Sequence, residues 1–572
     1  MESTAAQPPA AMAPAGRSGA RILVDQLVAH GVGHVFCVPG ESFLAVLDAL
    51  YDSPIALTVC RQEGGAAMMA EAQGKLSGRP GICFVTRGPG ATNAAAGIHV
   101  AQQDSTPLLL FVGQVARGTR GREAFQELDY RAVFGTMAKW VVEIDESSRI
   151  PELVSRAFQT ALSGRPGPVV IALPQDMLSE LASVADSQPC VVPQAYPGQA
   201  DMGAFEQLLA KTRRPLVVLG GSRWSAGAVA DVRAFAERCA LPVACSFRRQ
   251  MLFDHDHECY AGDIGIGINP QLAERVRQAD LLLLIGARFS ETPSQGYQLL
   301  GIPTPAQTLV HVHAAAEELG KLYRPELSIQ STPAAFAAAL ARLAAPANLP
   351  WQDWTRAARQ DYLTWSNPAA IHLPGSLQMG QVMQVLAAAL PDDAILCNGA
   401  GNFATWVHRF WRFRRYATQL APTSGSMGYG VPAAIGAKRL YPERTVVVFA
   451  GDGDFMMHGQ ELATAVQYEL PIIVILLDNA MFGTIRMHQE RHYPGRVIGS
   501  SLRNPDFAAL ALAYGAYGER VATTAEFAPA LQRALDSGLP ALLHCLLDAE
   551  AITPTATLSS LRAAGLQRQA GN

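Results

Sequence analysis

The chain has 572 residues, a length that allows about three or four domains. Hydrophobic residues make up 49% of it and charged residues 16%, so large buried cores can form. The formal net charge of −4 gives no reason to expect nucleic acid or an anionic membrane surface as a partner. Nine cysteines are scattered without CxxC pairs, which argues against a zinc site or a disulfide framework and suits a reducing compartment.

The N-terminal segment MESTAAQPPAAMAPAG is rich in alanine and proline, and it has neither the basic region nor the apolar core of a signal peptide. Residues 1–18 are therefore expected to form a disordered tail. No apolar run approaches about 18 residues, so we expect no membrane-spanning helix and place the protein in the cytoplasm.

A first α/β unit is expected at residues 19–187, because short apolar runs alternate there with helical segments. The predicted strands cover residues 32–40, 55–60, 81–86, 108–112 and 168–173, and the predicted helices cover 22–30, 41–50 and 64–76. The Pro- and Gln-rich stretch that follows is typical of a linker.

A second α/β unit is expected at residues 202–345, with strands at 215–219, 242–245, 281–285 and 309–312 and a closing helix at 333–343 that Thr332 caps. After an Ala- and Pro-rich linker, a third unit covers residues 365–550, and residues 551–572 form a C-terminal tail. The expected fold is therefore α/β, with three doubly wound domains built on parallel sheets.

The stretch from Thr445 to Thr484 says most about function. It predicts a buried strand, a turn at Gly451-Asp452-Gly453, a helical segment and a second apolar strand that ends at Asn479. The carboxyl ends of neighbouring parallel strands meet at one edge of a sheet, which is where ligands bind in open α/β sheets.

The polar groups at these two strand ends suit a metal ion and a phosphate. Asp452 and Asn479 offer a carboxylate and an amide oxygen, and the main-chain carbonyl of Met481 can add a third, which are the ligands that Mg²⁺ prefers. Gly451 and Gly453 let the backbone approach an anion closely. An ordinary β–α turn of a Rossmann-like domain is the alternative interpretation.

This arrangement resembles the diphosphate-binding motif of thiamine-diphosphate enzymes, and most closely that of the acetohydroxyacid synthase, pyruvate oxidase and 2-oxo acid decarboxylase group. The resemblance covers nearly the whole chain beyond the N-terminal tail. It implies a pyrimidine-binding domain, a central domain and a diphosphate-binding domain, in that order, with thiamine diphosphate and Mg²⁺ as cofactors.

Glu63 is the predicted catalytic residue. Its segment RQEGGAAMMAE resembles the family pattern RHE-x-x-A-x-x-M-A-E, with Gln62 where the family often has histidine. Small apolar neighbours would strip water from the carboxyl group, although a solvated acid at a helix start is the plainer interpretation. The resemblance implies that Glu63 shares a proton with the aminopyrimidine ring, which prepares the cofactor to attack a 2-oxo acid and to hold the electrons after carbon dioxide leaves.

Further segments resemble cofactor-binding positions of the family. Met427 would be an apolar wedge under the bent cofactor, and the carbonyl of Gly425 would accept a hydrogen bond from its exocyclic amine, although a core methionine in a turn fits the pattern as well. The complete set of predicted cofactor contacts is Gly401, Asn402, Gly425, Ser426, Met427, Gly451, Gly453, Asp454 and Phe455.

Four residues resemble the substrate-pocket walls of relatives: Gly40, Glu41, Gln103 and Gln126. His488 is a fifth predicted pocket residue, either as an acid/base group or as a polar part of the wall. The synthases carry a tryptophan shortly after the position of Arg486, in a part of the second-substrate pocket where this chain has Met487-His488-Gln489. We therefore do not expect the pocket of the branched-chain biosynthetic synthases.

The middle domain leaves the flavin question open. Gly286-Ala287-Arg288-Phe289 resembles a flavin-contacting motif, but Val310-His311-Val312-His313 replaces the acidic strand end that would bind a ribose. These residues favour a domain without FAD, and bound FAD stays the alternative.

The sequence predicts a thiamine-diphosphate-dependent enzyme that decarboxylates a 2-oxo acid and ligates the acyl unit to an acceptor, as acetolactate synthase does. Alternatives are a flavin-dependent 2-oxo acid oxidase on the same scaffold and a non-catalytic cofactor-binding homologue. A nicotinamide dehydrogenase is disfavoured, because no GxGxxG follows the first strand. In relatives, one cofactor is clasped by two subunits, so a homodimer or a dimer of dimers is expected.

Overall fold

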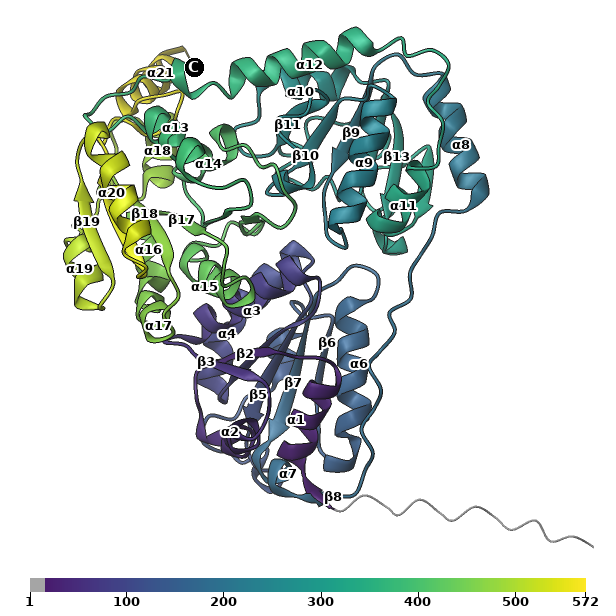
Figure 1. The fold of residues 1–572 in the computed structure, drawn as a ribbon, viewed down its shortest axis with the longest axis vertical. Coiled ribbons are helices and arrows are strands. Elements are labelled where there is room, and N and C mark those ends of the chain that lie inside the picture. The colour runs from purple at the N-terminus through teal and green to yellow at the C-terminus, as the bar shows by residue number, and fades with distance from the viewer. Residues whose placement is uncertain (1–15, 572) are drawn as a thin grey trace, which may run out of the picture.

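The computed structural model describes residues 16–571, so most of the predicted tail at residues 1–18 lies outside the described residues. Three lobes are visible in Figure 1, and each is built around a six-stranded sheet. All the pairings within these three sheets are parallel, and helices pack against the sheets, which confirms the predicted fold class. Within residues 16–571, no helix combines the length and the apolar character that a bilayer span requires.

The first sheet is buried on both faces, as its uninterrupted apolar strands predict. Its strands, in spatial order, are β3 (Ala56–Val59), β2 (His34–Cys37), β4 (Gly81–Val85), β5 (Leu108–Gln114), β7 (Pro168–Pro174) and β6 (Trp140–Glu143). Its helices are α1 (Gly19–Ala29), α2 (Leu44–Tyr51), α3 (Glu63–Ser77), α4 (Gly88–Asp104), α5 (Tyr130–Phe134), α6 (Ile150–Leu162) and α7 (Gln175–Ser179). Strand β1 (Arg17–Ser18) pairs antiparallel with β8 (Leu181–Ala182) beside it.

The second sheet has the strand order β11 (Tyr260–Ile264), β10 (Val243–Ser246), β9 (Pro215–Leu219), β12 (Leu281–Ile285), β13 (Thr308–His313) and β14 (Leu327–Gln330). Its helices are α8 (Gln199–Ala210), α9 (Ala226–Arg238), α10 (Pro270–Gln278), α11 (Pro333–Leu340) and α12 (Gln352–Trp365). The predicted cap is present, since the Thr332 side chain accepts a hydrogen bond from the Ala335 N–H. The edge strands β11 and β14 were not predicted, because they mix polar residues or glycine with few apolar ones.

The third sheet has the strand order β16 (Gln419–Leu420), β15 (Ile395–Asn398), β17 (Val446–Gly451), β18 (Ile472–Asp478), β20 (Ala541–Leu546) and β19 (Tyr517–Val521). Its helices are α13 (Met379–Ala389), α14 (Ala404–Phe410), α15 (Gly430–Leu440), α16 (Asp452–His458), α17 (Leu462–Gln467), α18 (Gly483–His492), α19 (Phe507–Ala513) and α20 (Thr524–Asp536). The segment expected as a C-terminal tail contains helix α21 (Leu558–Gly571), which packs on α18.

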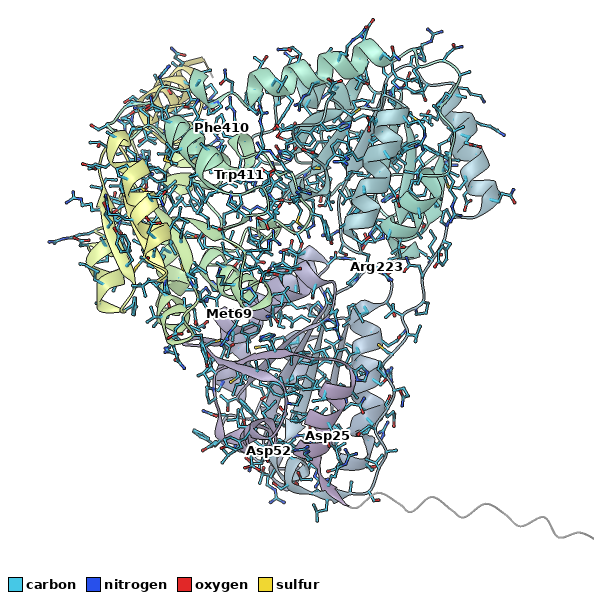
Figure 2. All side chains as sticks on the ribbon, in the orientation of Figure 1. Asp25, Asp52, Met69, Arg223, Phe410 and Trp411 are labelled. Atoms are coloured by element: carbon cyan, nitrogen blue, oxygen red, sulfur yellow. The ribbon has the colours of Figure 1, made fainter. Side chains whose placement is uncertain are left out.

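The first and third domains share one continuous hydrophobic core, in which helices α3 and α15 pack closely. A Cβ atom on Gly436 of α15 would lie 2.5 Å from the carbonyl oxygen of Met69 on α3, so only glycine permits this approach. Met69 lies where the two lobes meet in Figure 2. This packing fixes helix α3, which begins at Glu63, relative to the third domain.

Candidate active site

A cavity of about 360 Å³ lies at the carboxyl edge of the third sheet, a volume within the range of small-molecule sites. The loops that follow β15, β17 and β18 form most of its wall, and the middle domain adds Phe247, Arg248 and Ile266. Ten residues predicted from the sequence line it: Gly401, Asn402, Gly425, Met427, Gly451, Asp452, Gly453, Asp454, Asn479 and Met481. Folding therefore brings together segments that lie up to 80 residues apart in the chain.

Asp452 and Asn479 come from adjacent parallel strands, because Gly451 of β17 is opposite Leu477 of β18. The Asp452 side chain is buried, and its Oδ1 accepts the Gly453 N–H at 2.9 Å. The Met481 N–H donates to Oδ2 of Asp452 at 3.2 Å, which holds the loop after β18 against the carboxylate. Burial raises the pKa of Asp452 to about 6.

Asn504 was not predicted as part of this site, and it bridges the two acidic groups there. Its Nδ2 donates to Oδ2 of Asp452 at 2.7 Å and to Oδ1 of Asp478 at 2.8 Å. The other oxygen of Asp478 lies 2.9 Å from Nε2 of His544. Asn504 stands in an irregular loop well after β18, so no local pattern could reveal its contact with Asp452.

The site fits a magnesium ion held by oxygen atoms. No group of three or more His, Cys, Asp or Glu side chains in residues 16–571 is arranged to hold a metal. One carboxylate, the Asn479 amide oxygen and a main-chain carbonyl are instead the hard ligands that Mg²⁺ takes when phosphate oxygens supply the rest. The Asn479 amide has no hydrogen bond among the described residues, so its oxygen is available.

Asp454 ties the loops of the cavity together. Its Oδ1 accepts the N–H groups of Ala400 and Gly428, each at 3.0 Å. Burial raises the pKa of Asp454 to about 7. The sequence predicts this position as a main-chain contact to the cofactor, and the structure adds a side chain that fixes two cavity loops.

Gly425 has φ +69°, a left-handed conformation that favours glycine, and a Cβ there would meet no atom within 4 Å. The backbone therefore lies open at this point of the cavity. Two other predicted contacts do not line the cavity: the Ser426 hydroxyl donates to the carbonyl of Met427, and Phe455 is buried against the ring of Phe507.

Glu63 is the first residue of helix α3. Asn93 of α4 donates a hydrogen bond to its Oε2 at 3.0 Å. The Gln62 side chain caps α3 by accepting the Gly65 N–H, and it also lies 3.1 Å from Nε2 of His458 in the third domain. Glutamine at position 62, where the family often has histidine, therefore caps helix α3 and contacts the third domain.

Glu461, which the sequence did not single out, holds the segment in front of Glu63. Its fully buried carboxylate accepts the N–H groups of Arg61 and Gln62 at 3.0 and 2.9 Å. Burial raises the pKa of Glu461. Hydrogen bonds from the third domain therefore hold the two residues that precede Glu63 in the first domain.

Three predicted substrate residues join Glu63 at the carboxyl edge of the first sheet. Gly40 lies against Thr86, Glu41 pairs with Arg87 at 3.1 Å, and the Gln126 carbonyl accepts the Gly88 N–H at 3.0 Å. Gly90 completes the edge, since a Cβ there would lie 3.3 Å from Oε1 of Glu63.

Gln103 and His488 lie elsewhere. Gln103 is near the end of α4, where its carbonyl accepts a hydrogen bond from Arg288 of the middle domain at 2.6 Å. His488 is exposed on α18 and stacks on His492, with ring centroids 6.1 Å apart. Within one chain, neither belongs to the cavity or to the edge around Glu63.

The two groups of predicted residues form two separate surfaces. Every residue that lines the cavity in the described part of the chain belongs to the middle or third domain, and Glu63 is not among them. The predicted cofactor contacts therefore line a cavity that lacks Glu63, and Glu63 lies at a separate edge of the first domain.

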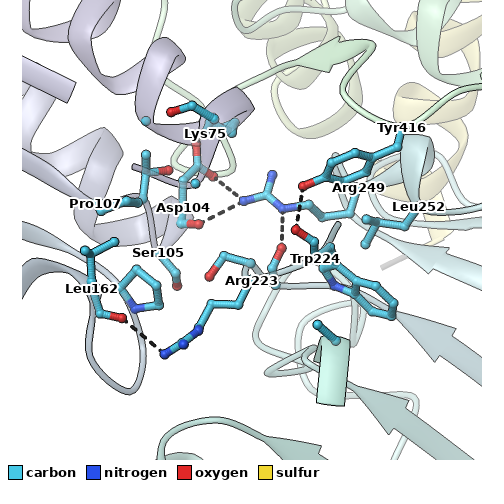
Figure 3. A pocket seen from close by; sticks show the side chains of 18 of the residues that line it. Lys75, Asp104, Ser105, Pro107, Leu162, Arg223, Trp224, Arg249, Leu252 and Tyr416 are labelled. Atoms are coloured by element: carbon cyan, nitrogen blue, oxygen red, sulfur yellow. Dashed lines mark hydrogen bonds and ion pairs between the residues drawn. The ribbon is translucent and has the colours of Figure 1, made fainter. Parts of the chain in front are cut away.

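The middle domain meets the first domain at a second cavity of about 450 Å³, drawn in Figure 3. There Arg249 donates to the carbonyl oxygens of Gly221 and Asp104, both at 2.9 Å. Arg288 donates to the preceding carbonyl of α4, that of Gln103. These guanidinium groups satisfy the free carbonyls at the C-terminus of α4, where the helix dipole also favours cations.

The same arginines fill the carboxyl edge of the middle sheet. The space between Gly221, Phe247 and Arg288 is only about 70 Å³. A flavin dinucleotide needs several times that volume, on the scale of about 300–1,000 Å³ for ligand pockets. This space shares Asp104, Ser105, Gly221 and Arg249 with the cavity of Figure 3, and the absence of FAD stays a prediction.

The fold and the site define a three-domain α/β protein with a cavity at the carboxyl edge of the sheet in its last domain, which is the class to which thiamine-dependent enzymes belong. Three family descriptions match in order: thiamine pyrophosphate enzyme, N-terminal TPP binding domain at residues 17–133, central domain at 203–340, and C-terminal TPP binding domain at 399–545.

Relatives match over almost the full chain. The acetolactate synthase isozyme 2 large subunit of Escherichia coli K12 is 32% identical over 537 residues, covering 93% of this chain and 96% of that protein. The acetolactate synthase large subunits of Parasynechococcus marenigrum and Corynebacterium glutamicum are 32% and 31% identical, covering 93% and 92% of this chain and 88% and 87% of theirs. The chain belongs to the thiamine pyrophosphate enzyme family, and its predicted resemblance and enzyme class are confirmed.

Proposed function

We propose that the protein decarboxylates a 2-oxo acid with thiamine diphosphate and Mg²⁺ and transfers the remaining acyl unit to an acceptor, as its acetolactate synthase relatives are named for doing. The observation that carries this proposal is the convergence of Asp452, Asn479 and the glycine loops on one cavity of sufficient size. The bound cofactor supplies the electron sink for the carbon–carbon bond cleavage.

In this proposal, the residues of the chain bind the metal and the cofactor and hold the cofactor in position. Asp452, Asn479 and the Met481 carbonyl would hold the metal, and the backbone around Gly401 and Gly451 would approach the diphosphate. The apolar side chain of Met427 and the open carbonyl of Gly425 would support the cofactor between its two rings. The Glu63 carboxyl group would exchange a proton with the aminopyrimidine ring, since Asn93 and the start of α3 hold it in place.

We further propose a homodimer, or a dimer of dimers, in which the first-domain edge of one copy covers the cavity of the other. Exposed apolar side chains on both surfaces support this arrangement: Phe125, near Gln126, is 74% exposed, and Ile266 and Ile485 in the cavity wall are 65% and 53% exposed. A C₂ pair joined in this way would complete two sites at once.

Co-expression of two defective chains tests the shared site. Chains with Glu63→Gln and chains with Asp452→Ala are each expected to be inactive alone. Mixed dimers would contain one intact and one doubly defective site, which predicts recovery of about a quarter of wild-type activity. No recovery above either single variant, or an active monomer in sedimentation, would contradict the proposal.

A panel of 2-oxo acids, assayed with and without aldehyde or 2-oxo acid acceptors, tests the reaction. We expect carbon dioxide release and ligated products only with thiamine diphosphate and Mg²⁺ present. Carbon dioxide release without a ligated product would assign a simple decarboxylase. Calorimetric binding of the cofactor with no turnover across the panel would favour a non-catalytic homologue.

We propose that the enzyme works without FAD and in the cytoplasm. The arginine-filled edge of the middle sheet supports the first statement, and purified protein is expected to be colourless. The nine cysteines are free, and eight of them are buried, which suits a reducing compartment. A yellow protein would contradict the absence of FAD, and oxidation of a 2-oxo acid that consumes oxygen would restore the oxidase alternative.

A further inference from the structure

His458 is the last residue of α16 and is buried between the third domain and the first, yet no sequence pattern assigned it a role. Its Nε2 lies 3.1 Å from Oε1 of Gln62, the residue that precedes Glu63. Its Nδ1 lies 3.2 Å from the carbonyl oxygen of Gly428, which follows the cavity residue Met427. The ring therefore connects the segment before the predicted catalytic acid with a loop of the cofactor cavity.

Two glycines make room for the imidazole ring of His458. A Cβ atom at Gly64 would lie 3.0 Å from its Nε2, and a Cβ atom at Gly428 would lie 2.6 Å from its Nδ1. Gly428 also has φ +76°, a conformation that favours glycine. The close approach of both backbone segments to the ring therefore depends on glycine at both positions.

Both ring nitrogens of His458 face oxygen acceptors. Burial lowers the pKa of His458, so at pH 7 the ring is mostly neutral and carries one N–H. The Gln62 amide cannot reverse to offer a donor, because its Oε1 already accepts the Gly65 N–H at 3.0 Å as the cap of α3. The neutral ring can therefore donate to Gln62 or to Gly428, but not to both.

The contact with Gln62 is the one that reaches Glu63. Gln62 caps α3, Glu63 is the first residue of that helix, and a fixed cap holds the first helical turn. Among residues 16–571, the His458 ring is the only side-chain group within hydrogen-bond distance of the Gln62 side chain. Gly428 has another anchor, since its N–H donates to Oδ1 of Asp454 at 3.0 Å. Loss of the ring would therefore release Gln62 more than it releases the loop.

Resting on the proposed function, we propose that His458 is a positioning residue, which donates from Nε2 to Gln62 and so holds Glu63 in place for proton exchange with the cofactor. Glu461 fixes the main chain of this segment by accepting the N–H groups of Arg61 and Gln62. His458 adds the support of the capping side chain. Proton transfer depends strongly on geometry, since a misplacement of about 1 Å can cost about 100-fold in rate.

Two substitutions separate the two contacts of the ring. The amide of His458→Asn can reach only the place of Nδ1, whereas the longer side chain of His458→Gln can reach the place of Nε2. With the donor that the 2-oxo acid panel identifies, His458→Asn should lower kcat about tenfold, and His458→Gln should stay within about threefold of wild type. The affinity for thiamine diphosphate with Mg²⁺, measured by calorimetry, should stay within about threefold in both variants, because His458 does not line the cavity.

Two double-mutant experiments test the path from the ring to the acid. In urea unfolding of the cofactor-free protein, His458→Gln should have a higher midpoint than His458→Asn, and this difference should largely disappear in a Gln62→Ala background. Adding His458→Asn to Glu63→Gln should slow kcat no further than Glu63→Gln alone, because the ring acts through that acid. A purely structural loss would instead multiply the two effects on kcat.

His255→Asn is the matched control. His255 is another buried histidine of the chain, 1% exposed, and its Nε2 lies 3.1 Å from the carbonyl oxygen of Gln250. It lines neither the cofactor cavity nor the edge around Glu63. Its variant is expected to lower the urea midpoint and to leave kcat within about threefold of wild type.

The outcomes separate the two proposals. Wild-type protein that turns over no 2-oxo acid overturns the proposed function and the role of His458 with it. Active wild-type protein with equal kcat values in His458→Asn and His458→Gln overturns only the role of His458. Retained activity in His458→Asn with a loss in His458→Gln also overturns that role, because it assigns the function to the contact with Gly428.

Discussion

The carboxyl edges of the first and third sheets have the same doubly wound construction but opposite character. The third-domain edge surrounds a cavity with buried acids, of which Asp452 and Asp454 are both 3% exposed. The first-domain edge carries Glu63 half-buried, the Glu41 carboxylate largely in solvent and Phe125 protruding. In the proposed dimer, the third-domain edge of one subunit would hold the ligand and the first-domain edge of the other subunit would cover it. The difference between the two edges is what such a shared site requires.

The largest effect on activity is expected from a substitution of Glu63, at the carboxyl edge of the first sheet. Glu63→Gln keeps the shape and the contact with Asn93 but removes the acid, so kcat should fall about 10²- to 10⁴-fold. Cofactor affinity should fall by about tenfold or less, because one hydrogen bond changes. Calorimetry and steady-state kinetics measure the two quantities.

Glu152→Gln is the control for that substitution, since Glu152 lies on the surface of α6 and pairs only with Arg149. Full activity in Glu63→Gln would show that the first-domain edge is not catalytic and would remove the contrast between the two edges.

The next largest effect is expected on stability, at Asp104, where the first domain contacts the middle and third domains. Asp104 is buried between Lys75 at 2.6 Å and Arg249 at 3.6 Å (Figure 3). It also accepts a hydrogen bond from the Thr423 N–H of the third domain at 2.9 Å. Asp104→Asn leaves the buried Arg249 without its anion and Lys75 with Glu71 alone, and it should lower the free energy of unfolding by about 3–5 kcal/mol. Urea unfolding at pH 7 measures it.

The same variant has a defined pH dependence. Burial opposes ionisation of Asp104, but Lys75 and Arg249 hold its pKa at about 2, below the ordinary value. The ionised group therefore stabilises the fold above about pH 4, and this contribution disappears as the pH falls through about 2. The stability difference between wild type and Asp104→Asn should shrink over that range, and a difference that stays constant would contradict the ion-pair origin.

A smaller effect is expected at the C-terminal helix. Arg562 of α21 donates two hydrogen bonds, at 2.6 and 2.8 Å, to the buried carboxylate of Glu490 on α18. Arg562→Ala should lower the free energy of unfolding by about 1–3 kcal/mol and speed amide exchange in α18, which lines the cavity through Thr484 and Ile485. Arg568→Ala, which loses only one exposed hydrogen bond to the Arg491 carbonyl, should change neither quantity.

The smallest effect is expected from alanine at Gly425 or Gly78, and comparing these two variants separates the cost of backbone strain from the loss of a ligand contact. Gly425→Ala and Gly78→Ala both place a methyl group at positive φ with no atom within 4 Å, so each should cost about 1–2 kcal/mol of stability. Gly78 ends α3 away from the cofactor cavity. Only Gly425→Ala should weaken cofactor binding in calorimetry, and equal effects on binding would exclude Gly425 as a contact.

Local sequence patterns located most of the central strands, although not β20, and most of the residues that line the cavity. Strands such as β4, β5 and β18 are uninterrupted apolar runs because both of their faces are covered, and a signal of this kind is readable without the fold. The edge strands β6, β11 and β14 escaped prediction because their pairing depends on one neighbouring strand more than on their own composition. Helix α21 escaped for a related reason: its stability rests on Glu490, far earlier in the chain.

Sequence alone determined the order of the three domains, the acid that begins α3 and the paired strand ends at Asp452 and Asn479, because these features depend on short segments. Only the tertiary structure could show that Glu63 stands apart from the cavity and that Asn504 and Glu461 hold the two edges. Each of those facts is a distance between segments remote in the chain, and such distances are set by packing, which no local pattern encodes.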